Sequence, residues 1–310
     1  MKKIIAAAVA TAFVAPAFAA DVAVSGFFEH SFVSTKTDGA MGQDLEASEA
    51  YFVIKADSEL ANGMSAGADY SIRTDGNHWS GASVYVAGSF GKLELGDTSG
   101  AIDTIDDKAD VFHMYDNGSG TTTNDADLNW SLPALADGLK VNVAYSPEES
   151  GEDDASAYGI DQHNDGGGAA GSTGISLSYA VMDGLTVGFG RDQLSSAEQE
   201  TENTLYNLVY SLNGIRIAYE KAESSNDTDT TTATQETEQT SMAVSYSMND
   251  VTVHFGTNKT EDIDAGTTDS DVTAFGIEYS LGDLVLFAEQ AEDDEGNKDE
   301  LTAVGVAYKF

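Results

Sequence analysis

The sequence predicts an all-β protein, a 16-stranded antiparallel β-barrel that crosses a membrane. Three observations support this fold class: strict alternation of apolar with small or polar residues, regular exchange of short and long connections, and the placement of aromatic residues. The 310 residues include no cysteine, which excludes a disulfide framework and leaves stability to hydrogen bonding and packing.

The N-terminus predicts a cleaved secretory signal peptide over residues 1–19, followed by one barrel domain over residues 20–310. Lys2 and Lys3 precede an apolar stretch, which ends in the small-residue site Ala17-Phe18-Ala19. A membrane anchor is the alternative, but the stretch is shorter than the roughly 18 residues that a spanning helix needs, and Pro16 interrupts it.

Beyond the signal peptide, short segments alternate apolar with small or polar residues. This period of two places one face of each strand in an apolar medium and the other face against small polar surroundings. Clear examples of the apolar positions are Val141, Val143 and Tyr145, then Ile175, Leu177 and Tyr179, then Met242, Val244 and Tyr246, and finally Val251, Val253 and Phe255.

The connections between these segments come in two sizes that alternate along the chain. Seven short turns are rich in Gly, Asn and Asp, which tolerate positive φ; they lie near residues 61–63, 90–91, 135–138, 182–184, 213–214, 248–250 and 281–283. Eight longer polar connections lie near residues 35–46, 74–81, 98–124, 147–173, 193–203, 224–239, 260–271 and 292–300. Fifteen connections join 16 strands, with short periplasmic turns and long extracellular loops.

Aromatic residues give an independent check on strand direction. In a membrane barrel they gather at the two lipid interfaces. With the N-terminus on the short-turn side, descending strands end near Tyr179, Tyr210, Tyr246, Tyr279 and Tyr308, whereas ascending strands place Tyr145, Phe189, Tyr219 and Phe255 toward the outer side. The two groups form two girdles; a soluble β-protein with aromatic core residues is the alternative.

The charge is strongly acidic, with 53 Asp and Glu residues against 14 Lys and Arg and a formal net charge of −39. Most of the acids lie in the eight long connections, where the only bases are Lys36, Lys108 and Lys298. Such a surface excludes nucleic acid as a partner. The aromatic-rich alternation argues against disorder for most of the chain.

Three segments resemble the general porins of Gram-negative bacteria, especially those of marine and photosynthetic proteobacteria. They are the last strand Leu301–Phe310, the start Asp21–Phe27 of the mature chain, and the hairpin Val84–Gly96. The resemblance implies a 16-stranded barrel in the outer membrane, usually a homotrimer, surrounded by lipid and lipopolysaccharide. It also implies that Tyr308 and Phe310 form the signal that the barrel-assembly machinery reads.

The resemblance further implies that the third long loop folds inward and narrows the lumen. The matching loop runs from Thr98 to about Asn124 and carries Lys108 together with the candidate constriction acids Asp103, Asp106, Asp107, Asp110 and Asp116. In the family such acids face bases on the adjacent wall, and the candidates for these are Lys55, Arg73 and Lys92. Few other bases are present, so this sequence departs from the full arginine ladder of better-known members.

These features predict a passive, cation-preferring channel for small hydrophilic solutes and ions, without enzymatic activity or a required cofactor. The five histidines have no metal-ligand spacing, and no Gly-x-Ser-x-Gly motif marks a nucleophile. The acids Glu152, Asp153 and Asp154 could bind Ca²⁺ loosely. The alternatives are a structural or adhesive surface barrel with a plugged lumen and a soluble exported β-protein.

Overall fold

The protein is described from a computed structural model. The described residues are 21–37, 40–60, 62–73, 80–118, 126–147, 171–195, 199–228, 235–295 and 299–310. The predicted signal peptide lies outside them.

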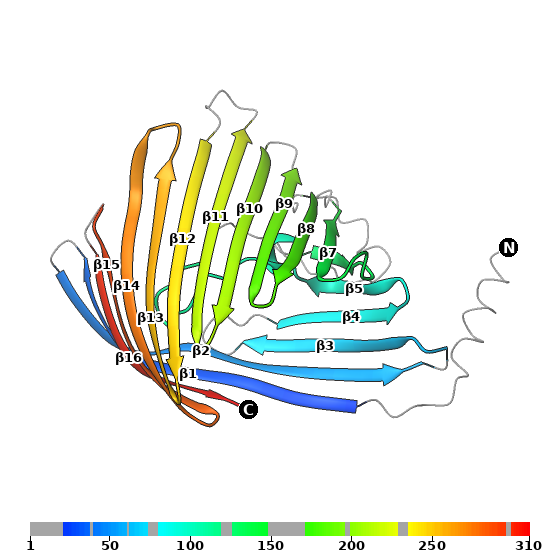
Figure 1. The fold of residues 1–310 in the computed structure, drawn as a ribbon, viewed down its shortest axis with the longest axis horizontal. Coiled ribbons are helices and arrows are strands. Elements are labelled where there is room, and N and C mark those ends of the chain that lie inside the picture. Colours follow the sequence, from blue (N-terminus) through cyan, green and yellow to red (C-terminus); the bar gives the residue numbers. More distant parts are fainter. Residues whose placement is uncertain are drawn as a thin grey trace, which may run out of the picture.

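Sixteen antiparallel strands form one closed barrel, as the alternation predicts. Figure 1 shows them in chain order, from blue at β1 to red at β16. Their bounds are β1 Asp21–Thr37, β2 Ala40–Glu59, β3 Ser65–Arg73, β4 Ser80–Gly88, β5 Gly91–Thr98, β6 Ala126–Ser131, β7 Leu139–Ser146, β8 Gly171–Met182, β9 Leu185–Ser195, β10 Gln199–Leu212, β11 Ile215–Thr228, β12 Gln235–Met248, β13 Val251–Asp262, β14 Thr267–Leu281, β15 Leu284–Asp293 and β16 Glu300–Lys309.

The barrel closes where the first strand pairs with the last. Each strand is hydrogen-bonded to its neighbours in sequence, and β1 also pairs with β16 from Phe27 opposite Lys309 to Lys36 opposite Glu300. Gly26 and Phe310 exchange two backbone hydrogen bonds at the end of this seam. Closure leaves no free sheet edge in the wall, which is the condition for strands to cross a lipid bilayer.

The two faces of the wall differ as the period of two requires. On β14 the outward Phe275 and Ile277 are 60% and 49% exposed, whereas Ala274, on the inner face, is fully buried. Tyr179, Tyr246 and the other exposed tyrosines lie on the same outer face as these apolar residues. Apolar side chains therefore point toward lipid, and small or polar side chains point into the lumen.

The short turns have the backbone geometry that their residues predict. Asn213 and Gly214 both have positive φ, 51° and 83°, as a two-residue type I′ hairpin requires. Gly184 has φ 80° in the turn between β8 and β9, and Gly282 has φ 68° in the turn between β14 and β15. These turns fix the register of the strands that they join.

At the other end of the barrel the strands extend further than the apolar pattern predicts. The predicted connection over residues 35–46 contains strand up to Thr37 and again from Ala40, and the one over 260–271 contracts to residues 263–266. Backbone hydrogen bonds hold these extensions, and they need no apolar face once the strands leave the lipid. The long connection after β5 also contains one short 3₁₀ helix, η1 (Ile102–Thr104). Among the described residues, no helix is both long and apolar enough to cross a membrane.

Candidate functional site: the constriction loop in the lumen

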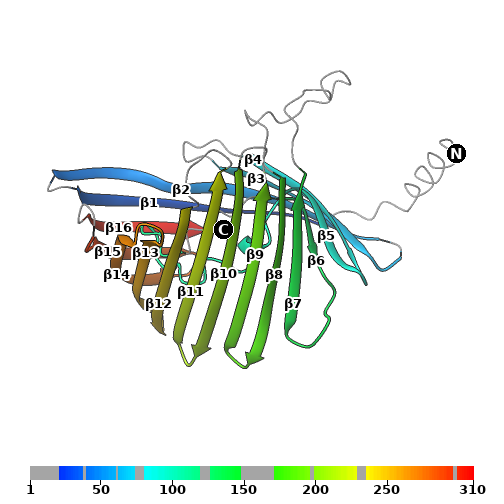
Figure 2. The ribbon, with the colours of Figure 1, turned by 90° about the horizontal axis from the view of Figure 1, so that it is seen from above.

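Loop 3, defined as residues 99–125 between β5 and β6, folds into the barrel, and the structure describes it as far as residue 118. In Figure 2 the teal trace that continues from β5 lies within the ring of strands. Its first part packs on the lumen face of the middle strands, where Ile102 and Ile105 form a buried cluster with Leu205 and Ala222. Loop 3 therefore begins by covering the wall formed by β8 to β11.

Wall side chains bind the backbone of loop 3 along its course. Glu220 on β11 is fully buried and accepts a hydrogen bond of 2.8 Å from the Ala109 N–H. Arg216, also on β11, donates to the Lys108 carbonyl. Ser241 donates to the Gly118 carbonyl at 3.0 Å. These bonds pair backbone groups of loop 3 that lie in no helix or strand. They also hold the loop against the wall.

Glycines on the wall make room for the middle of loop 3. A Cβ atom at Gly256 would lie 2.6 Å from the Phe112 ring, and one at Gly276 would lie 3.1 Å from it. A Cβ atom at Gly190 would lie 3.0 Å from both Ile102 and Ile105. The wall glycines therefore leave the space that loop 3 occupies, because bulkier residues at these positions would displace the loop.

Residues 113–115 of loop 3 reach the seam of the barrel. Glu289 on β15 accepts hydrogen bonds from the N–H groups of His113, Met114 and Tyr115 at 2.9, 2.6 and 2.9 Å. The Ser31 hydroxyl on β1 lies 3.1 Å from the Met114 sulfur. The described part of loop 3 thus follows the inner wall from β6 round to β1, returns to β12 and β13 at Gly118, and leaves the wall of β2 to β5 uncovered.

The five candidate acids do not form one uniform ring of charge. Asp106 is 7% exposed, and burial, followed by the charges of Asp107 and Asp103, raises its pKa to about 8. Asp107 and Asp110 face the lumen water, but partial loss of solvent inside the barrel and the charge of Asp116 raise the pKa of both, that of Asp110 to about 6. The charge of loop 3 at neutral pH is therefore smaller than its composition indicates.

The three candidate wall bases lie on β2, β3 and β5, the part of the wall that residues 99–118 of loop 3 leave uncovered. Each is paired with a wall acid: Lys55 with Asp69 at 3.3 Å, Arg73 with Glu49 at 3.3 Å, and Lys92 with Glu94 at 2.8 Å. The Lys92 ammonium also lies 4.6 Å from the centre of the Tyr85 ring. Because carboxylates balance them locally, these bases present little net positive charge to the lumen.

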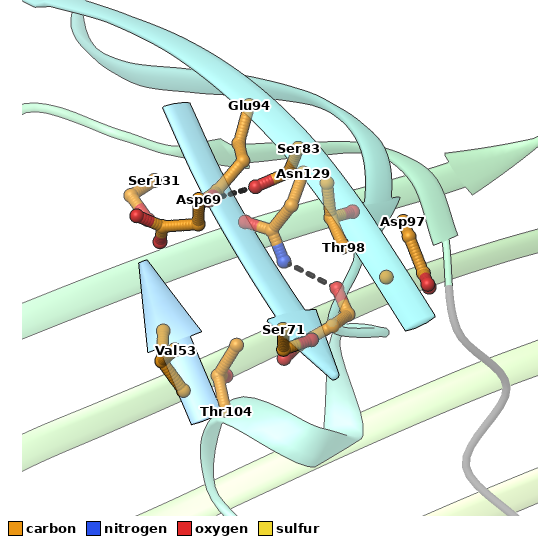
Figure 3. Close-up of a pocket in the computed structure, with 12 residues that line it drawn as sticks. Val53, Asp69, Ser71, Ser83, Glu94, Asp97, Thr98, Thr104, Asn129 and Ser131 are labelled. Atoms are coloured by element: carbon orange, nitrogen blue, oxygen red, sulfur yellow. Dashed lines mark hydrogen bonds between the residues drawn. The ribbon is translucent and has the colours of Figure 1, made fainter. Parts of the chain in front are cut away.

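A polar hollow of about 310 Å³ separates loop 3 from this uncovered wall. Figure 3 shows its side chains converging from β2 to β6 and from the start of loop 3. Ser83 donates to Glu94 at 3.1 Å, and Asn129 donates to the Ser99 carbonyl at 2.7 Å. The lining consists mainly of hydroxyl, amide and carboxylate groups: Asp69, Ser71, Ser83, Glu94, Asp97, Thr98, Ser99, Thr104, Asn129 and Ser131, with Val53 and Gly81. Such a lining accommodates hydrated solutes.

Several residues that position loop 3 are absent from the candidates chosen from the sequence. They are Glu29, Arg216, Glu220, His254, Glu278 and Glu289, together with His113 on the loop itself. The alternation already places the wall residues on the lumen face: Glu278, for example, lies between Ile277 and Tyr279. Their partners on loop 3 have no local sequence signal.

The C-terminal residues predicted to guide assembly lie at the seam. The Phe310 ring is 6.1 Å from Phe28 and 6.0 Å from Phe52, and it stacks on Tyr308 at 6.1 Å. Phe310 therefore joins β16 to β1 and β2 through an aromatic cluster. The predicted calcium ligands, Glu152, Asp153 and Asp154, lie outside the described residues.

The barrel matches known porin structures. The anion-selective porin of Comamonas acidovorans matches with a TM-score of 0.74 and 11% identity, over 94% of this chain and 100% of the other. OmpF of Salmonella typhi, in complex with daunomycin, gives 0.73 and 14% over 94% and 98%. The trimer form of OmpT of Vibrio cholerae gives 0.71 and 12% over 94% and 100%. These likenesses support the fold.

The sequence itself identifies the family. No curated protein matches the chain. The family model for Gram-negative porins, however, matches residues 6–298, which is nearly the whole length. Together with the closed 16-stranded barrel, this match shows that the chain is a member of the Gram-negative porin family and a multi-pass β-barrel of the outer membrane.

Proposed function

We propose that this porin is a water-filled channel for passive diffusion of small hydrophilic solutes and ions, with a preference for cations. The observation that carries the preference is the loop inside the lumen, which has five aspartates and a single lysine over its described part. Carboxylates beside a narrow aqueous path lower the energy of cations and raise that of anions.

The opposite wall supports the same preference. Lys55, Arg73 and Lys92 are each paired with an acid, so they provide little attraction for anions. The lining of the hollow adds hydroxyl and amide groups, which can form hydrogen bonds with a passing solute in place of water in its hydration shell. Family and fold indicate a channel rather than an enzyme.

We also propose a homotrimer that assembles through the outer face of β2 to β5. A shallow hollow of about 530 Å³ lies there, lined mainly by apolar and small residues: Ile54, Ala56, Ala68, Tyr70, Ala82, Val84, Leu95 and Gly96, with Asp69 and Ser83. Small residues let another copy of this face approach closely within the bilayer. We further propose that the protein contacts lipopolysaccharide and is recognised by the barrel-assembly machinery. We also propose that its acidic loops bind Ca²⁺ loosely.

The test is single-channel recording of the purified protein in planar bilayers with a potassium chloride gradient. We expect a steady current and a reversal potential of the sign that marks cation preference. The double variant Asp103→Asn/Asp107→Asn should reduce this preference. The control Asp137→Asn/Asp183→Asn makes an equal charge change in the short turns and should leave the preference unchanged. Anion preference would refute the selectivity, and the absence of current would favour a structural or adhesive barrel with a plugged lumen.

A further inference from the structure

Loop 3 places the imidazole of His113 between two wall carboxylates at the barrel seam. His113 Nδ1 lies 2.5 Å from Glu29 Oε2 on β1, and His113 Nε2 lies 3.3 Å from Glu278 Oε1 on β14. The imidazole also stacks on Phe287 of β15, with ring centres 4.1 Å apart and planes inclined by 6°. One side chain thus contacts three strands on both sides of the barrel seam.

Further ionisable groups surround His113. Glu289 on β15 accepts the His113 backbone N–H at 2.9 Å, so a third carboxylate lies beside the same residue. On β13, His254 Nε2 lies 3.1 Å from Glu278 Oε1, which is an ion-pair distance without hydrogen-bond alignment. Three carboxylates and one further imidazole therefore face His113 from β1, β13, β14 and β15.

We propose that His113 is the positioning residue of the constriction: its imidazolium fastens the segment 112–115 of loop 3 to β1 and β14 and so fixes the cross-section of the pore. This inference rests on the proposed channel function. The loop lies between the covered wall and the polar hollow, so release of residues 112–115 would let this segment move toward the open path. His113 acts through the position of loop 3 and does not line that hollow.

The protonation state of His113 decides whether both of its contacts with wall carboxylates persist. Burial alone would lower the pKa of His113, but the hydrogen bonds to Glu278 and Glu29, and then their charges, outweigh burial and raise it to about 9. A protonated imidazole donates from both nitrogens, whereas a neutral one keeps a single N–H and can serve only one of the two carboxylates. The neutral fraction rises about tenfold between pH 8 and pH 10.

The experiment is single-channel recording between pH 7 and pH 10, which compares wild type with His113→Gln, His113→Lys and His30→Gln. In wild type we expect the rate of brief conductance changes to rise about tenfold between pH 8 and pH 10. His113→Gln should fluctuate at every pH without this rise. His113→Lys keeps a positive charge past pH 9 and should stay quiet there, since a lysine ordinarily titrates near pH 10.4. His30 is adjacent to Glu29 but exposed, so His30→Gln should follow wild type.

The lysine variant also separates His113 from Asp106, because any contribution from Asp106 near pH 8 persists when His113 is replaced. If His113→Gln fails to assemble, His113→Lys alone decides, since it preserves the charge. A wild-type rise that persists unchanged in His113→Lys would overturn the proposal. A wild-type protein that conducts no current at any pH would overturn the channel function itself, which is a distinct result.

Discussion

The first prediction concerns Asp106 and states that cation preference increases with pH. Its pKa of about 8 means that about a tenth of Asp106 is ionised at pH 7 and about nine tenths at pH 9. Raising the pH through this window therefore adds nearly one negative charge to loop 3. The Asp106→Asn variant removes that charge change while it keeps a side chain of similar shape.

The size of the effect follows from Coulomb's law. A unit charge about 8 Å from the path of an ion contributes about 0.5 kcal/mol in a water-like medium, which is roughly a twofold change in local ion concentration. The change is opposite for cations and anions, so the permeability ratio changes about fivefold without screening. Salt near 0.1 M reduces this to about twofold, because the Debye length is then about 10 Å.

The assay is the reversal potential in a potassium chloride gradient at pH 6, 7, 8 and 9, measured in the His113→Lys background so that His113 does not titrate in the same range. Cation preference should rise between pH 7 and pH 9, and Asp106→Asn should abolish that rise while Asp137→Asn, in a short turn, retains it. A smaller rise near pH 6 should persist in Asp106→Asn, since it belongs to Asp110. An Asp106→Asn channel with the full wild-type rise would refute the reasoning.

Three further predictions concern packing and assembly. Gly256→Ala places a methyl group against Phe112 and should destabilise the barrel by about 1–3 kcal/mol, which would lower the thermal unfolding temperature. An unchanged unfolding temperature would contradict close packing of loop 3 against this glycine. Ala68→Trp fills the outer hollow and should convert the oligomer to monomer in native gels, whereas a stable trimer would exclude this face as the interface. Phe310→Ala removes ring contacts with Phe28 and others worth about 0.5–1.5 kcal/mol each and should slow insertion in cells; normal insertion would argue against an assembly role.

The sequence predicts the wall of the barrel well because local rules determine it. The period of two assigns each residue to the lipid or lumen face, and a two-residue turn such as Asn213-Gly214 fixes the register of both adjoining strands. Strand ends toward the outer side are predicted less well. The ladder between β1 and β2 continues to Thr37 and Ala40 although the apolar pattern has ended, because backbone pairing does not depend on side-chain polarity.

Loop 3 marks the limit of sequence reasoning. Its acids can be read directly, and the family resemblance implies that it folds inward, but it has no period that would say which residues touch the wall. Glu289 illustrates the difficulty: alternation places it on the lumen face, yet its three N–H partners lie about 175 positions away in sequence. Such contacts depend on closure of the whole barrel, which no local pattern encodes.

Closure of the barrel also changes how much charge loop 3 carries at neutral pH. A count of acids treats every aspartate of loop 3 as a full negative charge, and the strongly acidic composition then predicts an equally strong field. Inside the closed wall, however, Asp106 loses contact with water and binds its proton more tightly, and the wall carboxylates keep His113 protonated. Both shifts make the loop less negative at neutral pH. Selectivity in this porin should therefore depend on how deeply each acid is buried, and neutral pH should reveal only part of the field that the sequence contains.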